Sequence, residues 1–165
     1  MSFVVRNLQR SVPFSVERLR SHVSILVNIF EIKNYSLGVI CVSKFRIKRM
    51  NMMYRNVGRP TDVLSFPNQD PIVPGQFSSE PLLYDNCLGD IFLCPAVIKG
   101  QCASEGTDFQ DSLPVYVTHG ICHLLGYKHG TKEDWKLMFS KEHKILSTFS
   151  QRTGIDSAPL TSYSH

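Results

Sequence analysis

The stretch HGICHLLGYKH, residues 119–129, has three histidines in a spacing that predicts a shared site. His119 and His123 are four residues apart, so on an α-helix their side chains lie one above the other on the same face. Gly126 follows three residues later and can end that helix in the left-handed conformation, which glycine adopts at little cost. We expect the chain to turn back there and to bring His129 toward the same point.

Three imidazoles that converge on one point form the ligand set of a catalytic zinc ion, because the fourth coordination position stays open. The sequence therefore predicts one Zn²⁺ per chain, bound by His119, His123 and His129. The alternative is three unrelated histidines in the core or on the surface, which the helical spacing and the glycine turn disfavour. Cys122 lies in the same stretch, but the metal-facing side of the helix is already taken by histidines. A small buried side chain is expected there.

Gly120 separates this stretch from the helix of a zinc peptidase. In H-E-x-x-H helices the glutamate beside the first histidine is the general base. Here that position is a glycine, so the spacing matches but the proton acceptor is missing. Hydrolysis of peptides is therefore the less favoured function.

The composition is typical of a single globular domain. The chain has 165 residues, of which 42% are hydrophobic and 19% are charged, within the ordinary range. Since no apolar run approaches the ~20 residues that cross a bilayer, no membrane partner is expected. The five cysteines include no C-x-x-C pair. This favours reduced thiols in an intracellular compartment over a disulfide framework.

The net charge of +4 is unevenly distributed. Residues 1–60 contain eleven Lys or Arg against two acids, a formal charge of +9, whereas residues 61–165 carry −5. There is no acid between Ile32 and Thr61, where Lys44, Arg46, Lys48, Arg49, Arg55 and Arg59 all fall. Such a segment is expected either on a surface that binds phosphates or on a solvated helix face. Beside a hydrolytic metal site, it favours a polyanionic substrate.

Hydrophobic periodicity predicts an α+β fold, with a small mixed sheet packed with helices in a single compact domain. Strands are expected at 2–8, 35–42, 62–66 and 88–93. Helices are expected from Pro13 to residue 33, from 44 to 54 after Ser43 as N-cap, at 95–105, at 113–125, and after Thr131 as N-cap.

The same pass along the chain sets the domain boundaries. Residues 67–85 contain four prolines and are expected to form a long loop. We expect the domain to span residues 1–150. Residues 151–165, rich in Ser and Thr, are expected to form a flexible tail.

Four sequence blocks together resemble the YbeY family of metal-dependent endoribonucleases. They are YR at 54–55, PTDVLSFP at 60–67, LGDI at 88–91 and the histidine stretch at 119–129. They occur in the family's order and cover most of residues 35–130, and their combination is far more specific than any one of them. Gly130-Thr131 and the helix that carries Trp135 look like the vertebrate branch. Lys128 stands where bacterial members commonly have an acid.

The resemblance implies a function and a set of site residues. The family's zinc ligands correspond to His119, His123 and His129, and its basic residue in the metal cleft corresponds to Arg55, the expected catalytic residue. Family members are single-strand-specific endoribonucleases that act in ribosomal RNA maturation and in ribosome assembly or quality control. The expected partners are therefore ribosomal RNA and small-subunit ribosomal proteins or assembly factors, with no DNA and no membrane.

Three further residues near these blocks have less certain roles. Asp62 and Asp90 are candidates to orient a histidine through its second ring nitrogen. Asp62 can equally satisfy backbone donors of the Pro60-Thr61 turn. Arg59, in that turn, is expected to be a peripheral RNA contact.

Two other functional classes remain as alternatives to RNA cleavage. In the first, the protein is an assembly factor that docks on a ribosomal particle, and its zinc is mainly structural. In the second, it is a metallohydrolase of peptides or small molecules, which Gly120 and the basic first third of the chain disfavour.

Residues 1–20 have a composition seen in mitochondrial import signals, with four arginines and Glu17 as the single acid. Because the predicted domain begins almost at residue 1, we expect an uncleaved signal and a mitochondrial location, with the cytosol or nucleus as alternatives.

Overall fold

The computed structural model describes residues 2–68, 72–78 and 86–161. Within these ranges, β1 (Ser2–Asn7), β2 (Ser36–Cys41), β3 (Val63–Pro67) and β4 (Cys87–Leu93) form a four-stranded sheet in the order β1-β2-β4-β3. The β1–β2 and β2–β4 pairs are parallel, and β3 runs antiparallel to β4. The expected α+β class with a small mixed sheet is confirmed.

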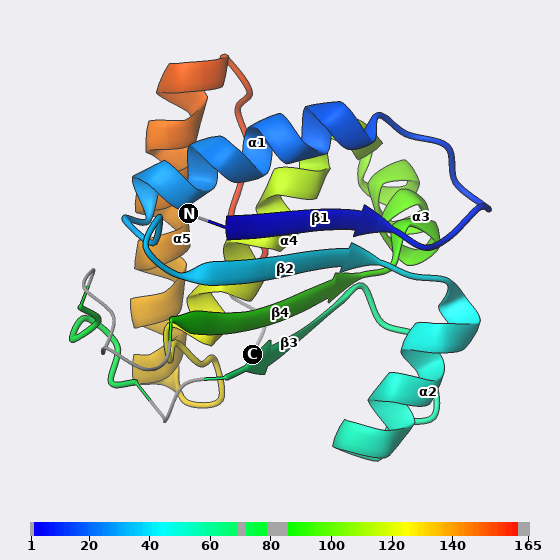
Figure 1. Ribbon diagram of the computed structural model, residues 1–165, viewed down its shortest axis with the longest axis horizontal. Helices are drawn as coiled ribbons and strands as arrows, with labels where there is room; N and C mark the ends of the chain where they lie inside the picture. Colours follow the sequence, from blue (N-terminus) through cyan, green and yellow to red (C-terminus); the bar gives the residue numbers. More distant parts are fainter. Residues whose placement is uncertain (1, 69–71, 79–85, 162–165) are drawn as a thin grey trace.

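The described helices are α1 (Val16–Ile29), α2 (Lys44–Arg55), α3 (Pro95–Glu105), α4 (Phe109–Leu124) and α5 (Lys132–Thr153). Figure 1 shows α1, α4 and α5 on one side of the sheet, while α2 stands apart from the other helices at one end. The central helix is α4, which contacts β3 and β4 as well as α1 and α5. None of these helices is long and apolar enough to cross a membrane.

Two apolar clusters hold these elements together. The larger one lies between the sheet and the helices on its covered face, and includes Leu19, Val39, Ile91, Ile121 and Phe149. A smaller one attaches α2 to the end of the sheet and includes Val42, Ile47, Leu64 and Cys94, of which Ile47 belongs to α2. Burial of Ile47 together with Leu64 therefore fixes the N-terminal part of α2 relative to β3.

Capping side chains set the helix starts, and two of them differ from expectation. Ser43 and Thr131 accept hydrogen bonds from Arg46 N and Asp134 N, so both predicted N-caps are confirmed. Helix α1 begins at Val16 rather than at Pro13, because Ser15 caps it. Helix α4 begins at Phe109, four residues before the expected start at 113, because Asp108 caps it.

The described chain extends beyond the expected domain boundary and ends at a buried residue, Thr161. Helix α5 continues to Thr153, past the boundary expected at residue 150. Thr161 is only 2% exposed, although it lies in the segment for which a flexible tail was expected. Residues 162–165 of that segment lie outside the described residues, as do 69–71 and 79–85 of the expected long loop.

Candidate metal centre

The three predicted histidines converge at the C-terminal end of α4. The rings of His119 and His123 lie 4.7 Å apart between centroids, and their Nε2 atoms are 3.1 Å apart. The ring of His129 lies 5.6 Å from that of His119 and 5.1 Å from that of His123. One ligand atom from each histidine lies within 4.8 Å of the other two. The cluster is consistent with a metal site.

The glycine turn after α4 brings His129 to the other two histidines. Gly126 has a φ of +95°, and its N–H donates to the carbonyl of His123 at 3.1 Å. The N–H of Tyr127 donates to the carbonyl of Cys122 at 3.0 Å, which completes a Schellman motif. A β-carbon on Gly126 would lie 1.8 Å from the carbonyl oxygen of Ile72. The predicted left-handed glycine is confirmed, and the turn also has no room for a side chain.

The Nδ1 atoms of His119 and His123 each lie within hydrogen-bonding distance of an oxygen atom on the side away from the other histidine rings. Nδ1 of His123 lies 3.0 Å from the carbonyl oxygen of Tyr127, and Nδ1 of His119 lies 3.3 Å from Oε1 of Glu142. Because both partners are acceptors, both neutral rings carry their proton on Nδ1. The lone pairs of the two Nε2 atoms then face each other, an arrangement that a shared cation stabilises.

The spacing of the two Nε2 atoms fits a zinc ion. Two nitrogen ligands at the usual 2.0–2.1 Å, in tetrahedral geometry, lie about 3.3 Å from each other. The observed separation of 3.1 Å is close to that value. The residues present therefore suit a small divalent cation that prefers nitrogen ligands.

The surroundings keep His123 in the neutral state that binds metals. Burial, followed by the neighbouring His119 and His129, lowers the pKa of His123 from 6.5 to about 4. At neutral pH a proton therefore does not compete for its Nε2 atom. Cys122 is fully buried, and burial raises its pKa well above the usual value, so it remains a thiol. It belongs to the apolar core, as expected.

A cavity of about 400 Å³ joins the histidines to Arg55. It is lined by Arg55, the three histidines and residues 61–65 of the turn and strand β3. Arg55 is the last residue of α2, and Asn56 ends that helix in the left-handed conformation. The structure thus brings together the four residues that the sequence predicted for the site, while Arg59 is not among those that line the cavity.

The two aspartates have different outcomes. Asp62 lines the cavity, but its Oδ1 accepts from the N–H of Val63 at 2.7 Å and from the hydroxyl of Thr61 at 3.3 Å, which supports the turn-stabilising alternative. Asp90 is exposed and borders a separate hollow with Gly38 and Arg6. The expectation that Asp90 orients a histidine is wrong, because the alternation of β4 points Ile91, not Asp90, toward α4.

Glu142 contacts Nδ1 of His119, a partner that the sequence did not predict. It lies 23 positions from His119 and is 0% exposed. A signal was available, because Glu142 replaces an apolar residue on the buried stripe of α5 that includes Met138, Ile145 and Phe149. A glutamate in such a stripe indicates a buried partner.

Comparison with known proteins assigns the family. The model of the family described as endoribonuclease YbeY matches residues 4–150. A human endoribonuclease YbeY is 44% identical over 98% of this chain and 96% of its own length. One from Thermobifida fusca is 34% identical over 89% of this chain and 93% of its own.

A solved structure has a similar overall fold. The solution structure of a Thermotoga maritima protein superposes with a TM-score of 0.55 at 25% identity, and covers 97% of this chain and 99% of its own. The match to the family model extends over all three histidines and Arg55. This chain belongs to the YbeY endoribonuclease family.

Proposed function

We propose that this protein is a zinc-dependent endoribonuclease that cuts single-stranded ribosomal RNA during ribosome maturation or quality control. The observation that carries the proposal is the shared cavity, in which a permanently charged guanidinium and three converging imidazoles face the same space. Membership of an endoribonuclease family supports RNA as the substrate.

The side chains of the cavity have separable roles. His119, His123 and His129 would hold the ion, which when bound supplies a Lewis acid for the phosphate and lowers the pKa of a bound water toward ~7. The planar, positively charged guanidinium of Arg55 binds the non-bridging oxygens of the scissile phosphate through two parallel hydrogen bonds. The position of Arg55 at the C-terminus of α2 also places its charge where the helix dipole favours a cation.

Helix α2 offers a surface for the RNA strand that leads to this cavity. Phe45 and Tyr54 are 71% and 65% exposed and lie on opposite sides of the helix, and the ring of Tyr54 packs edge-on against Phe66 of β3. The guanidinium of Arg49 lies 5.8 Å from the centre of the Phe45 ring. Exposed aromatic rings among basic side chains bind single strands, because bases stack on the rings while the cations meet the phosphates. This arrangement supports single-stranded over double-stranded RNA.

The peptidase alternative is disfavoured at Gly120, where zinc peptidases have the glutamate that acts as general base. Gly120 packs against Ile91, and a β-carbon there would lie 2.8 Å from Cγ2 of Ile91. A glutamate at this position would require Ile91 to move, and the chain has no carboxylate where a peptidase has its base.

The decisive experiment is cleavage of a labelled structured ribosomal RNA, with zinc content measured on every preparation. We expect the wild type to cut, Arg55→Glu to keep its zinc without cutting, and His119→Ala to lose zinc. Arg152→Glu is the matched control, because it makes the same charge reversal at an exposed position of α5 that does not line the cavity.

Equal cutting by the wild type and Arg55→Glu would move the activity away from this cavity. The assembly-factor alternative would then be favoured, in which the zinc is structural and the basic surface docks on a ribosomal particle. Binding to small-subunit ribosomal proteins, tested with Arg55→Glu, separates docking from cleavage because docking does not need a charge inside the cavity.

The proposed location is the mitochondrion, reached with an uncleaved N-terminal signal. Deleting residues 1–20 is a poor test, because β1 pairs with β2 along its whole length. Fusing residues 1–20 to a fluorescent reporter is better. Import of the fusion, and its loss when the four arginines are changed to glutamine, is the expected result; a reporter that stays in the cytosol contradicts it.

A further inference from the structure

Glu142 connects the metal helix to the C-terminal segment, residues 155–161. On one side its Oε1 lies 3.3 Å from Nδ1 of His119. On the other side Oε1 accepts from the N–H of Leu160 at 3.0 Å, and Oε2 accepts from the hydroxyl of Thr161. A fully buried carboxylate is costly unless its lone pairs are satisfied. Among the described residues, the partners of this carboxylate come from α4 and from the C-terminal segment.

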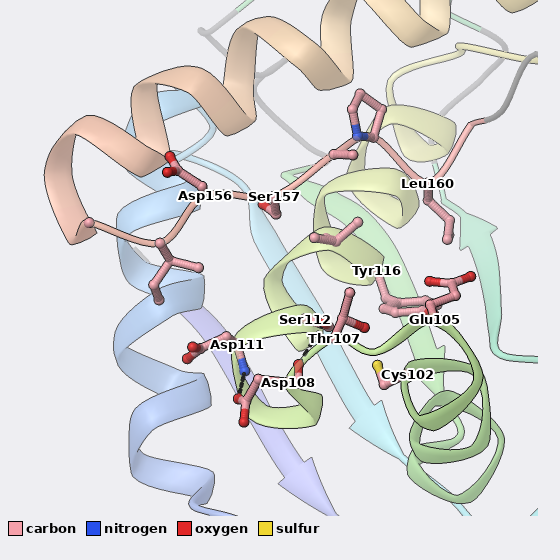
Figure 2. A pocket seen from close by; sticks show the side chains of 15 residues that line it. Cys102, Glu105, Thr107, Asp108, Asp111, Ser112, Tyr116, Asp156, Ser157 and Leu160 are labelled. Atoms are coloured by element: carbon pink, nitrogen blue, oxygen red, sulfur yellow. Dashed lines mark hydrogen bonds between the residues drawn. The ribbon is translucent and has the colours of Figure 1, made fainter.

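The C-terminal segment is held at its two ends. After Gly154 ends α5, the hydroxyl of Ser150 donates to Asp156, and five residues after Asp156 the side chain of Thr161 is buried against Glu142. Figure 2 shows the part in between, with Asp156, Ser157 and Leu160 on one side of a cavity and Tyr116 on the other. This cavity has a volume of about 520 Å³. The contact at Thr161 is therefore made locally and does not follow from close packing along the whole segment.

We propose that Glu142 is a positioning residue for the metal ligand His119, and that the C-terminal segment holds Glu142 in place through Leu160 and Thr161. The inference rests on the proposed metal site, and it does not depend on which RNA is cut. It makes the end of the chain part of the metal centre.

Glu142 can act on the metal site by fixing the tautomer and the orientation of the His119 imidazole. Donation from Nδ1 to Oε1 fixes the tautomer of His119 and directs its Nε2 lone pair toward His123. The negative charge also makes the imidazole a stronger ligand. The oxygen of Thr161 lies 3.4 Å from the same Nδ1, so the hydroxyl that donates to Glu142 can accept from the ring. Carboxylate, hydroxyl and ring form one closed network.

Zinc affinity of the full-length chain, measured by competition with a chromophoric chelator, tests the proposal. Glu142→Gln keeps the shape but removes the charge, and we expect zinc to bind roughly 10- to 100-fold more weakly. Thr161→Val removes one hydrogen bond to the carboxylate, and we expect a loss of roughly fivefold. It leaves Glu142 itself intact, so it keeps the test valid if Glu142→Gln folds poorly.

The matched controls lie on α5. Glu133→Gln makes the same charge change at an exposed position, and Thr148→Val removes a hydroxyl that donates to the carbonyl of Lys144. Both should bind zinc as the wild type does. The visible spectrum of the cobalt-substituted protein should change with Glu142→Gln and not with Glu133→Gln, because it reports the geometry of the ligands.

A double-mutant cycle separates positioning from general stability. In the His119→Ala background, Glu142→Gln should leave the residual affinity unchanged, because there is no ring to hold. Wild-type affinity in Glu142→Gln and Thr161→Val would overturn the inference, whereas loss of zinc in His119→Ala would still support the metal site. A wild-type protein that binds no zinc would overturn both.

Discussion

Gly120 of α4 lies so close to Ile91 of β4 that a β-carbon on the glycine would stand 2.8 Å from Cγ2 and 2.9 Å from Cδ1 of the isoleucine. The carbonyl of Gly120 also accepts from the hydroxyl of Ser65 on β3 at 3.2 Å. The absence of a peptidase base is thus tied to how closely the metal helix packs on the sheet.

This contact predicts that Gly120→Ala destabilises the protein, although alanine is normally the better helix former. Overpacking a core typically costs about 1–3 kcal/mol. Thermal unfolding should show the loss, and Ile91→Ala in the same chain should relieve part of it, because the clashing atoms are gone.

Gly100→Ala is the control for this prediction. Gly100 lies inside α3 with nothing within 4 Å of an added β-carbon. There the ordinary helix preference should apply, with a gain of roughly 0.5–1 kcal/mol. Equal effects at positions 100 and 120 would mean that the contact with Ile91 has no energetic weight.

Gly126→Ala should weaken zinc binding as well as stability. A β-carbon there meets the carbonyl of Ile72 at 1.8 Å, so the turn must move and His129 with it. Gly106→Ala, also at a left-handed position but with open space around it, should cost only the ~1–2 kcal/mol of backbone strain. The measurements are zinc affinity and thermal unfolding of both variants. Unchanged zinc affinity in Gly126→Ala would show that the turn does not determine the position of His129.

The predicted ligands and the missed Glu142 show what kind of information a sequence makes accessible. His119 and His123 are related by the helix period, and Gly126 indicates the turn before His129. Both relationships involve residues that are close together in the sequence. Glu142 of α5 contacts His119 of α4, so its role depends on how these two helices pack against each other. Tyr127 holds His123 through its backbone carbonyl, which no side-chain pattern reveals.

The differences in the fold have similar physical causes. The strands and α3 follow from short apolar runs and from Pro95, and the structure places them within two residues of the expected bounds. The start of α4 was expected too late, because Asp108 caps the helix ahead of Leu113 and Pro114 is accommodated inside it. The error at Asp90 was avoidable, since strand alternation already separates it from Ile91.

Reversing charges on α2 should weaken RNA binding in a salt-dependent way. We expect the triple variant Arg46→Glu, Lys48→Glu, Arg49→Glu to lose affinity for a single-stranded RNA. The slope of log affinity against log salt should become shallower by about 0.7 for each lost phosphate contact. Reversing the exposed Lys132, Lys136 and Lys144 of α5 makes the same change in net charge. Equal losses in both triple variants would indicate attraction by net charge alone, with no strand path along α2.

Protein stability should fall on acidification because of His22, a buried histidine outside the metal centre. Burial and then the charge of Arg18 lower its pKa below 6.5, and Asp111 opposes them weakly. Its ring packs edge-on against Phe149, 5.3 Å between centroids. Below pH 6.5 the unfolded chain therefore binds a proton that the folded chain resists, so the free energy of unfolding decreases as the pH falls through this window.

His22→Leu should make that slope shallower, because leucine fills a similar space without titrating, while the contribution of His123, whose pKa is also lowered, remains. The readout is the slope of unfolding free energy against pH between 7.5 and 5.5, where one such group contributes up to about 1.4 kcal/mol per pH unit. Slopes are compared between variants, so any constant packing cost of the leucine cancels. His143→Gln, at an exposed position of α5, should keep the wild-type slope. A wild-type slope in His22→Leu would assign the acid sensitivity to the histidines of the metal centre instead.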